Sequence, residues 1–226
     1  MRQISSLTDI FESSVSKQRV SGAVFLSSLG GGNPDRYWPG KKIKQVDDWP
    51  TVNLLIRRKI FQQIGGFDSK YWPGEDTKLC LDIINLGKKI IYDPQVVVWH
   101  HRRAGIIKHL KQIGGYGLHR GFFARKYPET SFKIKYFIPA IFFLSIISGA
   151  MLSYPFPVIR PFFLLGLLIY ALTLIFASWQ IYQKEKDFLI SIFSLLYIFF
   201  THIYYGIRFI QGFILTRNIK NKLANL

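Results

Sequence analysis

The distribution of apolar residues divides the chain near residue 136. Downstream of this point, three nearly uninterrupted apolar runs cover residues 136–153, 158–179 and 188–205. A helix needs about 20 apolar residues to cross the hydrocarbon core of a bilayer, so these runs predict three membrane-spanning helices. Upstream, apolar residues form shorter groups separated by polar loops, which predict short helices and strands.

Two short helices are predicted upstream from apolar residues that recur every three or four positions. Residues 1–20 form the first of them. Residues 78–86 form the second, in which Leu79, Ile83 and Leu86 share one face.

Glycines predict where helices end, and short apolar runs predict strands. Gly65 and Gly66 are expected to end a helix that begins near Arg57, and Gly87 to end the helix over 78–86, because glycine adopts the left-handed conformation that ends helices at low cost. Short runs of apolar residues then predict three strands, over residues 51–56, 88–92 and 96–99.

A pair of carboxylates stands at the start of the helix over 78–86. Glu75 and Asp76 fall at its positive end, so the helix dipole is expected to keep Asp76 ionised at neutral pH. An ionised carboxylate beside the aromatic loop of Tyr71 and Trp72 suits a general base that takes a proton from a hydroxyl. The alternative for Asp76 is the N-cap of the helix, a position that Asp often fills.

A basic cluster follows the predicted strand over 96–99, and it consists of His100, His101, Arg102 and Arg103. Such a cluster suits a diphosphate leaving group or a metal–diphosphate complex, because guanidinium groups bind phosphate oxygens through paired hydrogen bonds. Taken alone, the two histidines more often form a polar strand end than a ligand pair.

The order of several short motifs resembles a family of enzymes. The chain contains NLLIRR at 53–58, IGGFD at 64–68, GEDTKL at 74–79, YDP at 92–94 and VWHHRR at 98–103. Together these look like the acceptor-side half of a family 2 glycosyltransferase. The motifs that follow are similar to membrane-anchored, exopolysaccharide-type members, and they are YGLHRG at 116–121 and PETS at 128–131.

The resemblance implies a GT-A fold, an inverting reaction and a UDP- or GDP-type nucleotide-sugar donor. It implies that Asp76 is the catalytic base and that Glu75, a positioning carboxylate, belongs with it to a motif near the acceptor hydroxyl. The residues expected to bind substrate or the donor diphosphate are His100, His101, Arg102, Arg103, Trp72 and Asn53.

The chain departs from the family at the nucleotide-binding half. In the family, this half is a Rossmann-like region that ends in an Asp-x-Asp motif, which holds Mg²⁺ or Mn²⁺ and the donor diphosphate. We find neither the region nor the motif in the sequence, and we interpret Asp47-Asp48 as a pair of loop acids. The metal ligands are therefore unknown, and the sequence predicts a truncated or split enzyme whose nucleotide-binding half is a separate chain.

The net charge of +17, from 30 Lys and Arg against 13 Asp and Glu, suits an anionic membrane surface or nucleic acid. Residues 104–135 are the most basic, and Glu129 is their one acid. Because apolar residues are interleaved with these charges and a span follows directly, we predict a basic amphipathic segment in the membrane interface and not a nucleic-acid site. The single cysteine, Cys80, excludes an intrachain disulfide.

The predicted organisation is a partial GT-A α/β domain over residues 1–103, an interfacial segment over 104–135, a transmembrane region over 136–215 and a basic tail over 216–226. The excess of Lys and Arg before the first span predicts a plasma-membrane protein whose catalytic part is cytoplasmic. Three spans then place the basic tail outside, which the same rule disfavours.

The sequence therefore predicts the acceptor-side, membrane-anchored part of an inverting glycosyltransferase that acts on a polysaccharide or lipid-linked acceptor. The alternative is a membrane anchor, a partner subunit or an inactive fragment without the nucleotide-binding half. A transporter is disfavoured, because the spans hold few charges and show no internal repeat.

Overall fold

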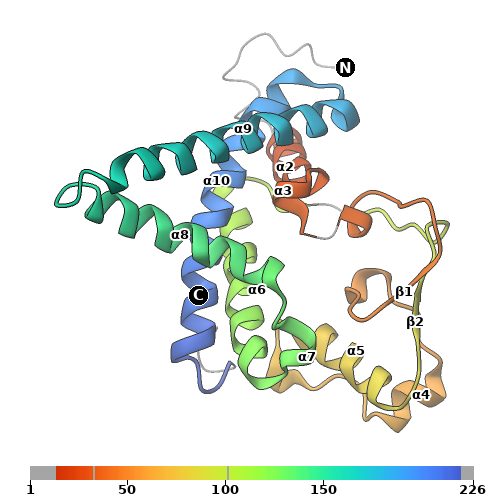
Figure 1. Ribbon diagram of the computed structural model, residues 1–226. Coiled ribbons are helices and arrows are strands. Elements are labelled where there is room, and N and C mark those ends of the chain that lie inside the picture. Colours follow the sequence, from red (N-terminus) through yellow and green to blue (C-terminus); the bar gives the residue numbers. More distant parts are fainter. Residues whose placement is uncertain (1–13, 33, 101, 220–226) are drawn as a thin grey trace.

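The computed structural model describes residues 14–32, 34–100 and 102–219. Three regions are visible in Figure 1: a small lobe with the two strands, a central pair of helices, and a long helical hairpin that extends away from both. Within these ranges the protein is mostly helical, and its one sheet has two strands. Of the helix predicted over 1–20, residues 1–13 lie outside the described residues, and α2 covers Ser14–Ala23.

The small lobe contains β1 (Lys44–Val46), β2 (Ile90–Tyr92), α4 (Arg58–Gln63) and α5 (Glu75–Asn85). β1 pairs antiparallel with β2, so that Lys44 lies opposite Tyr92. The strand predicted over 88–92 is thus confirmed in its last three residues. The apolar face of α5 packs on β2 through a core of Leu79, Cys80, Ile83 and Ile90.

The predicted glycine boundaries are confirmed. Gly65 and Gly66, which follow α4, have φ values of +79° and +77°, and Gly87, which follows α5, has a φ of +70°. Side chains with a Cβ atom rarely adopt these values, so the backbone itself requires glycine at the helix ends.

Two predicted strands are wrong. Residues 96–99 have no strand structure, and their side chains are exposed, with Trp99 97% exposed. Residues 51–56 form a short 3-10 turn (Thr51–Asn53) followed by irregular chain. Both segments have strand-like composition, but a strand also needs a neighbour to complete its hydrogen bonds, and among the described residues neither segment has one.

The remaining elements near the N-terminal end are short. They are the 3-10 turn Val24–Leu26, α3 (Ser28–Gly31), and the 3-10 turns Pro34–Arg36 and Ser69–Tyr71. The three residues of the first turn, Val24, Phe25 and Leu26, are buried.

The centre of the molecule is α6 (Ile106–Lys126), which packs along α10 (Phe188–Ile210) and the π-helical turn Gln211–Leu215. The two helices run side by side in Figure 1, and α7 (Pro128–Ser131) follows α6. Twelve residues of α6 are buried, among them His119 and Arg120. Of the five Lys and Arg residues of α6, Arg120 is buried, whereas Lys108, Lys111, Arg125 and Lys126 are exposed. The contact of the segment over 104–135 with a membrane remains a prediction.

Glycines explain how closely α6 packs on α10. A Cβ atom on Gly121 would lie 2.1 Å from the carbonyl oxygen of Phe209, and one on Gly117 would lie 2.6 Å from that of Tyr205. A Cβ on Gly212 would likewise lie 2.1 Å from the carbonyl oxygen of Leu118. The two backbones thus touch where glycine removes the side chain, as in close helix pairs of membrane proteins.

We expect Gly121→Ala to separate α6 from α10, because the new methyl group has no space against the Phe209 carbonyl. The expected cost is about 1–3 kcal/mol of stability, the range for overpacked sites. Thermal unfolding in detergent measures it. Gly166→Ala on α9 is the control, since a Cβ there meets nothing within 4 Å. Equal unfolding temperatures for the two variants would contradict the close contact.

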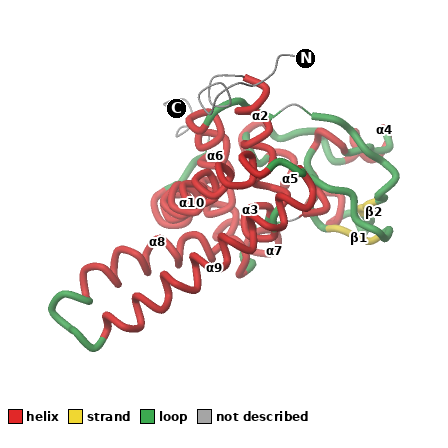
Figure 2. Tube along the Cα trace, turned by 90° about the horizontal axis from the view of Figure 1, so that it is seen from above, coloured by secondary structure: helices red, strands yellow, loops and turns green. Residues whose placement is uncertain are grey.

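Among the described residues, three helices are long and apolar enough to cross a membrane. They are α8 (Ile134–Leu152), α9 (Ile159–Glu185) and α10 with its π-helical extension, and each covers all or nearly all of one predicted run. α8 and α9 form the hairpin, and Figure 2 shows its closing turn at the end farthest from the rest of the molecule.

Candidate active site

The two predicted carboxylates occupy the first turn of α5. Gly74 is the N-cap of this helix, so the structure excludes the N-cap role for Asp76. One Asp76 carboxyl oxygen instead accepts a hydrogen bond from the backbone N–H of Thr77 at 2.7 Å. The Glu75 side chain is partly buried, and its Oε2 atom has no hydrogen-bond partner among the described residues.

Asp76 lines a cavity of about 200 Å³ between the small lobe and the long helices. Its lining residues come from the Phe25–Tyr37 region, the loop before α5, α6, the start of α8, and α10. The polar and charged side chains that line it with Asp76 are Arg36, Tyr37, Tyr116, His119, Arg120, Lys135, Tyr136, Thr201, His202 and Tyr205. The acid therefore faces a space bounded on one side by two of the candidate spans.

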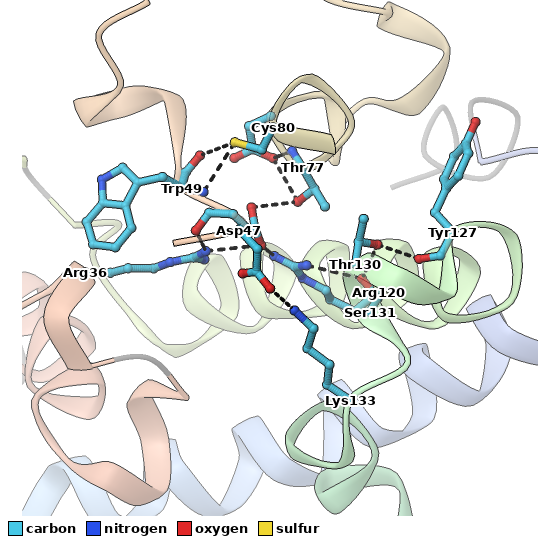
Figure 3. A network of polar contacts seen from close by, with 12 residues as sticks. Arg36, Asp47, Trp49, Thr77, Cys80, Arg120, Tyr127, Thr130, Ser131 and Lys133 are labelled. Carbon is cyan, nitrogen blue, oxygen red and sulfur yellow. Dashed lines mark hydrogen bonds and ion pairs between the residues drawn. The ribbon is translucent and has the colours of Figure 1, made fainter. Parts of the chain in front are cut away.

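A buried ion-pair cluster lies next to this cavity, and Figure 3 shows it. Its centre is Asp48, which is 6% exposed and pairs with Arg120 and with Arg36, the latter at 3.1 Å. The Thr77 hydroxyl donates a hydrogen bond to the other Asp48 oxygen at 3.3 Å. The cluster thus joins the loop before Trp49, α6 and the first turn of α5, where Asp76 lies.

The interpretation of Asp47-Asp48 as a pair of loop acids is corrected for Asp48. Only Asp47 is a surface residue, and it pairs with Lys133. The sequence pattern held no sign of the difference, because the partner that buries Asp48 is Arg120, 72 positions downstream.

Burial and charge together shift the pKa of Asp76 upward to about 6, first through burial and second through the nearby negative charge of Asp48. The backbone N–H of Thr77 and the charge of Arg120 oppose the shift. The expectation from the helix dipole is therefore corrected in direction: Asp76 is still mostly ionised at pH 7, but its pKa is above its ordinary value. A carboxylate with a pKa near 6 is suited to take up a proton near neutral pH.

The other groups of the cluster keep fixed charges. Burial opposes the charge of Asp48, but Arg120 and Arg36 lower its pKa below the ordinary range. Burial and Arg120 lower the pKa of His119 to about 3, so this ring stays neutral. Within the cluster and its neighbours, Asp76 is the group whose proton is most easily exchanged near pH 6.

The predicted basic cluster is only partly near this cavity. The guanidinium group of Arg102 lies 4.1 Å from the ring centroid of Phe25, a cavity-lining residue. Its Nε and Nη2 atoms are buried and have no hydrogen-bond partner among the described residues. His100 and Arg103 are exposed and do not line the cavity. His101 lies outside the described residues.

The two remaining predicted residues lie elsewhere. Trp72 is 57% exposed and does not line the cavity, although the next residue, Pro73, does. Asn53 lines a separate cavity of about 510 Å³ beside β2 and donates a hydrogen bond to the carbonyl oxygen of Val96 at 3.0 Å. Asp76 and Phe25 therefore line one cavity, and Arg102 lies against Phe25 at its wall. Asn53 and His100 do not line this cavity.

The described residues do not fit a metal ion. Within 14–32, 34–100 and 102–219, no group of three or more His, Cys, Asp or Glu side chains is placed to hold one. Cys80 is buried in the core beneath α5, and burial raises its thiol pKa to about 12, which disfavours the thiolate that binds metals.

Parts of the chain are similar to known glycosyltransferases. The chain is 28% identical over 82 residues to the pre-mycofactocin glycosyltransferase of Mycobacterium tuberculosis, strains CDC 1551 / Oshkosh and H37Rv; the match covers 36% of this chain and 17% of that protein. It is 37% identical over 62 residues to the probable glycosyltransferase YdaM of Bacillus subtilis strain 168, which covers 27% of this chain and 14% of that protein.

The chain thus matches less than a fifth of the length of these curated relatives. No family model and no solved structure matches it. The two similarities support a role in glycosyl transfer.

Proposed function

We propose that the chain is the acceptor-side and membrane-anchoring part of an inverting family 2 glycosyltransferase of GT-A fold, which transfers a sugar from a nucleotide-sugar to a polysaccharide or lipid-linked acceptor. The observation that carries the proposal is Asp76, a partly buried carboxylate with a pKa of about 6 that faces a cavity bounded by α8 and α10. The similarity to glycosyltransferases and the order of the motifs support it.

In the proposed reaction, Asp76 accepts the proton of the acceptor hydroxyl as that oxygen attacks the anomeric carbon of the donor. A new carbon–oxygen bond forms on one face of the sugar, and the bond to the nucleoside diphosphate breaks on the other, which inverts the configuration. Glu75 positions the acceptor from the same helical turn. Burial of Asp76 strengthens it as a base, because the carboxylate form is less well solvated there.

For the donor, the described part of the chain offers fewer well-placed residues than for the acceptor. Arg102, with two unpaired guanidinium nitrogens beside the cavity wall, is the described residue best placed to bind a diphosphate. We propose that His100, His101, Arg103, Trp72 and Asn53 join it only when the nucleotide-binding half is present. Because the described residues do not fit a metal, the Mg²⁺ or Mn²⁺ of the family belongs to that half.

An exposed apolar segment supports such a partner. Val96, Val97 and Val98 are each about half exposed, and Trp99 is almost fully exposed, directly before the basic cluster. A protein surface rarely leaves so many large apolar side chains in one row unless another surface covers them. We propose that the nucleotide-binding half, from the same or another polypeptide, packs against residues 96–99.

The walls of the cavity support an acceptor that is held in the membrane. Pro139 of α8 and Thr201 of α10 line the space that Asp76 faces, so such an acceptor can approach from the helices. This geometry supports a lipid-linked or membrane-bound glycan acceptor. We propose a multi-pass protein of the plasma membrane with Asp76 on the cytoplasmic side, because Lys and Arg are concentrated before the first span.

The test is a transfer assay on membranes that contain the chain, alone and together with the product of the reading frame upstream of it. Radiolabelled UDP-glucose, UDP-galactose, UDP-N-acetylglucosamine and GDP-mannose are offered as donors. We expect label in the membrane lipid or glycan fraction when both products are present. If the correctly inserted chain transfers no sugar under either condition, the result favours a membrane anchor or an inactive fragment.

The pKa of Asp76 gives a pH prediction. A base must be unprotonated, so the transfer rate at low substrate concentration should fall as the pH drops through about 6 and level off above about 7. An ordinary aspartate, with a pKa near 3.8, would leave the rate flat over this range. Rates measured from pH 5 to pH 8 distinguish the two cases, and a midpoint below pH 5 would contradict the proposed environment of Asp76.

A further inference from the structure

α10 differs from the other two candidate spans in how the protein covers it. In the most apolar window of α10 and its extension, 33% of the residues are buried inside the protein, against 6% for α8 and 11% for α9. On α9, large apolar side chains are exposed at adjacent positions, so they surround the helix: Leu164, Leu165, Leu167, Leu168, Ile169, Leu172, Ile175 and Phe176. Such a helix fits the interior of a bilayer.

The exposed apolar side chains of α10 form a single stripe. They recur every fourth position from Phe188 through Ile192 and Leu196 to Phe200. They continue at Ile207 and, in the π-helical turn, at Ile214 and Leu215. One apolar stripe on an otherwise covered helix is typical of a helix that lies along a membrane surface.

The opposite face of α10 is buried in the protein and carries both apolar and polar side chains. Thr201 shares a hydrogen bond with the buried ring of His109 at 2.8 Å, and His202 with the carbonyl oxygen of Leu29 at 3.0 Å. Arg208 is also buried and donates to the Gln211 side chain at 2.7 Å. Because these groups pair within the protein, this face of α10 is not exposed to lipid.

Both ends of α10 are tied to the side of the molecule that carries Asp76. At the start, Asp187 pairs with Arg19 of α2 at 3.2 Å. At the end, Arg125 of α6 donates to the carbonyl oxygens of Ile214, at 3.2 Å, and Thr216. α6 is anchored in turn through Arg120 to the cluster beside Asp76. The far end of α10 therefore cannot lie about 30 Å away across a bilayer core while these contacts hold.

The hairpin of α8 and α9 also begins and ends on this side. Lys133, directly before α8, pairs with Asp47, and Lys184 near the end of α9 donates to the carbonyl oxygen of Leu26 at 2.6 Å. The closing turn is at the far end, and Figures 1 and 2 agree that α10 crosses the direction of the hairpin steeply. The hairpin thus leaves this side of the molecule and returns to it.

We infer that the chain crosses the membrane twice, through α8 and α9, and that α10 lies along the membrane surface on the side of Asp76. The third predicted span is then not a crossing, and the end of the chain stays on the same side as the start of α8. This arrangement removes the conflict over orientation, because Lys133, Lys135 and Arg217 then share one side and Arg160 stands alone near the closing turn.

The inference does not depend on glycosyl transfer, and single-cysteine labelling tests it separately. Cys80 is the one cysteine of the sequence, so Cys80→Ala gives a cysteine-free background. Two exposed residues are then replaced in separate variants, Lys70→Cys in the lobe that carries Asp76 and Tyr154→Cys in the closing turn, and a third variant has a cysteine appended after Leu226. A membrane-impermeant maleimide is applied to intact and to permeabilised cells.

We expect Lys70→Cys and the appended cysteine to be labelled from the same side of the membrane, and Tyr154→Cys to be labelled from the other side. Reaction of the appended cysteine together with Tyr154→Cys would overturn the inference, because it requires α10 to cross. Reaction of all three sites on one side would overturn the two crossings. If Cys80→Ala reduces expression, fusions of alkaline phosphatase and of green fluorescent protein to the C-terminus of the natural chain report the side of that end independently.

Discussion

Replacement of Asp76 by asparagine is expected to lower the rate of glycosyl transfer by about 10²- to 10⁴-fold, the contribution typical of a general base. The amide keeps the size of the carboxyl group and can still accept the hydrogen bond from the Thr77 backbone, but it cannot take up the proton of the acceptor. The measurement is the transfer assay on membranes that contain the active assembly, with binding of the nucleotide-sugar measured in parallel. Donor binding should remain nearly unchanged.

The raised pKa of Asp76 also predicts how the replacement changes stability. The pKa of Asp76 is raised from 3.8 to about 6, so the folded protein holds a proton that the unfolded chain releases in that range. Above pH 6 the ionised carboxylate therefore costs about 3 kcal/mol of stability, at 1.4 kcal/mol per pH unit. Asp76→Asn should remove this cost, and the variant should be at least as stable as the natural chain at pH 7.

Asp82→Asn is the matched control on the same helix. Asp82 pairs with Lys78 across one turn at 2.7 Å, outside the cavity, so its replacement should change neither the transfer rate nor the unfolding temperature appreciably. If Asp76→Asn retained most of the transfer activity, Asp76 would not be the base. If it lost activity through poor folding alone, its unfolding temperature would fall below that of Asp82→Asn.

The parts of the fold that the sequence predicted are those that local interactions determine. The helix that carries Asp76, its end at Gly87 and the end of α4 at Gly65 and Gly66 depend on neighbouring residues and on the backbone freedom of glycine. The long apolar runs needed no partner to be recognised either. Their number could be counted from the sequence, but the difference between α10 and the hairpin could not, because it depends on contacts with α2 and α6.

The parts that the sequence missed depend on residues far apart in the chain. Residues 96–99 have the composition of a strand, but no neighbouring strand among the described residues pairs with them. The charged residues of α6 gave no indication of the close contact at Gly117 and Gly121, where the helix packs backbone to backbone against α10. The spacing of these two glycines was a signal present in the sequence, since small residues four positions apart favour close helix contacts.

Asp48 shows the same limit within the candidate site. Two adjacent aspartates before Trp49 offered no reason to distinguish a buried from an exposed acid. The distinction appears only when Arg36 and Arg120 approach from elements on either side. The cluster raises the pKa of Asp76 through the charge of Asp48, so a residue that the sequence did not single out helps to set the strength of the proposed base.

Asp48→Asn is expected to destabilise the protein by about 3–5 kcal/mol, the range for breaking a buried ion pair on one side. The new amide could still accept one hydrogen bond, but the positive charges of Arg36 and Arg120 would remain in a region of low dielectric without a counter-charge. Since burial alone makes charged arginines unfavourable and Asp48 offsets this for both, the loss falls on two groups at once. Thermal unfolding in detergent, followed by tryptophan fluorescence, measures the effect.

The adjacent residue provides the control, because Asp47→Asn removes the same charge from the same loop. The Asp47 side chain is 63% exposed and pairs with Lys133 at the surface, where such a pair is worth at most about 1 kcal/mol. The double variant Asp48→Asn/Arg120→Gln should lose less stability than the sum of the two single variants, because it removes one of the unpaired charges together with its partner. Equal losses for Asp47→Asn and Asp48→Asn would show that the cluster does not hold the three segments together.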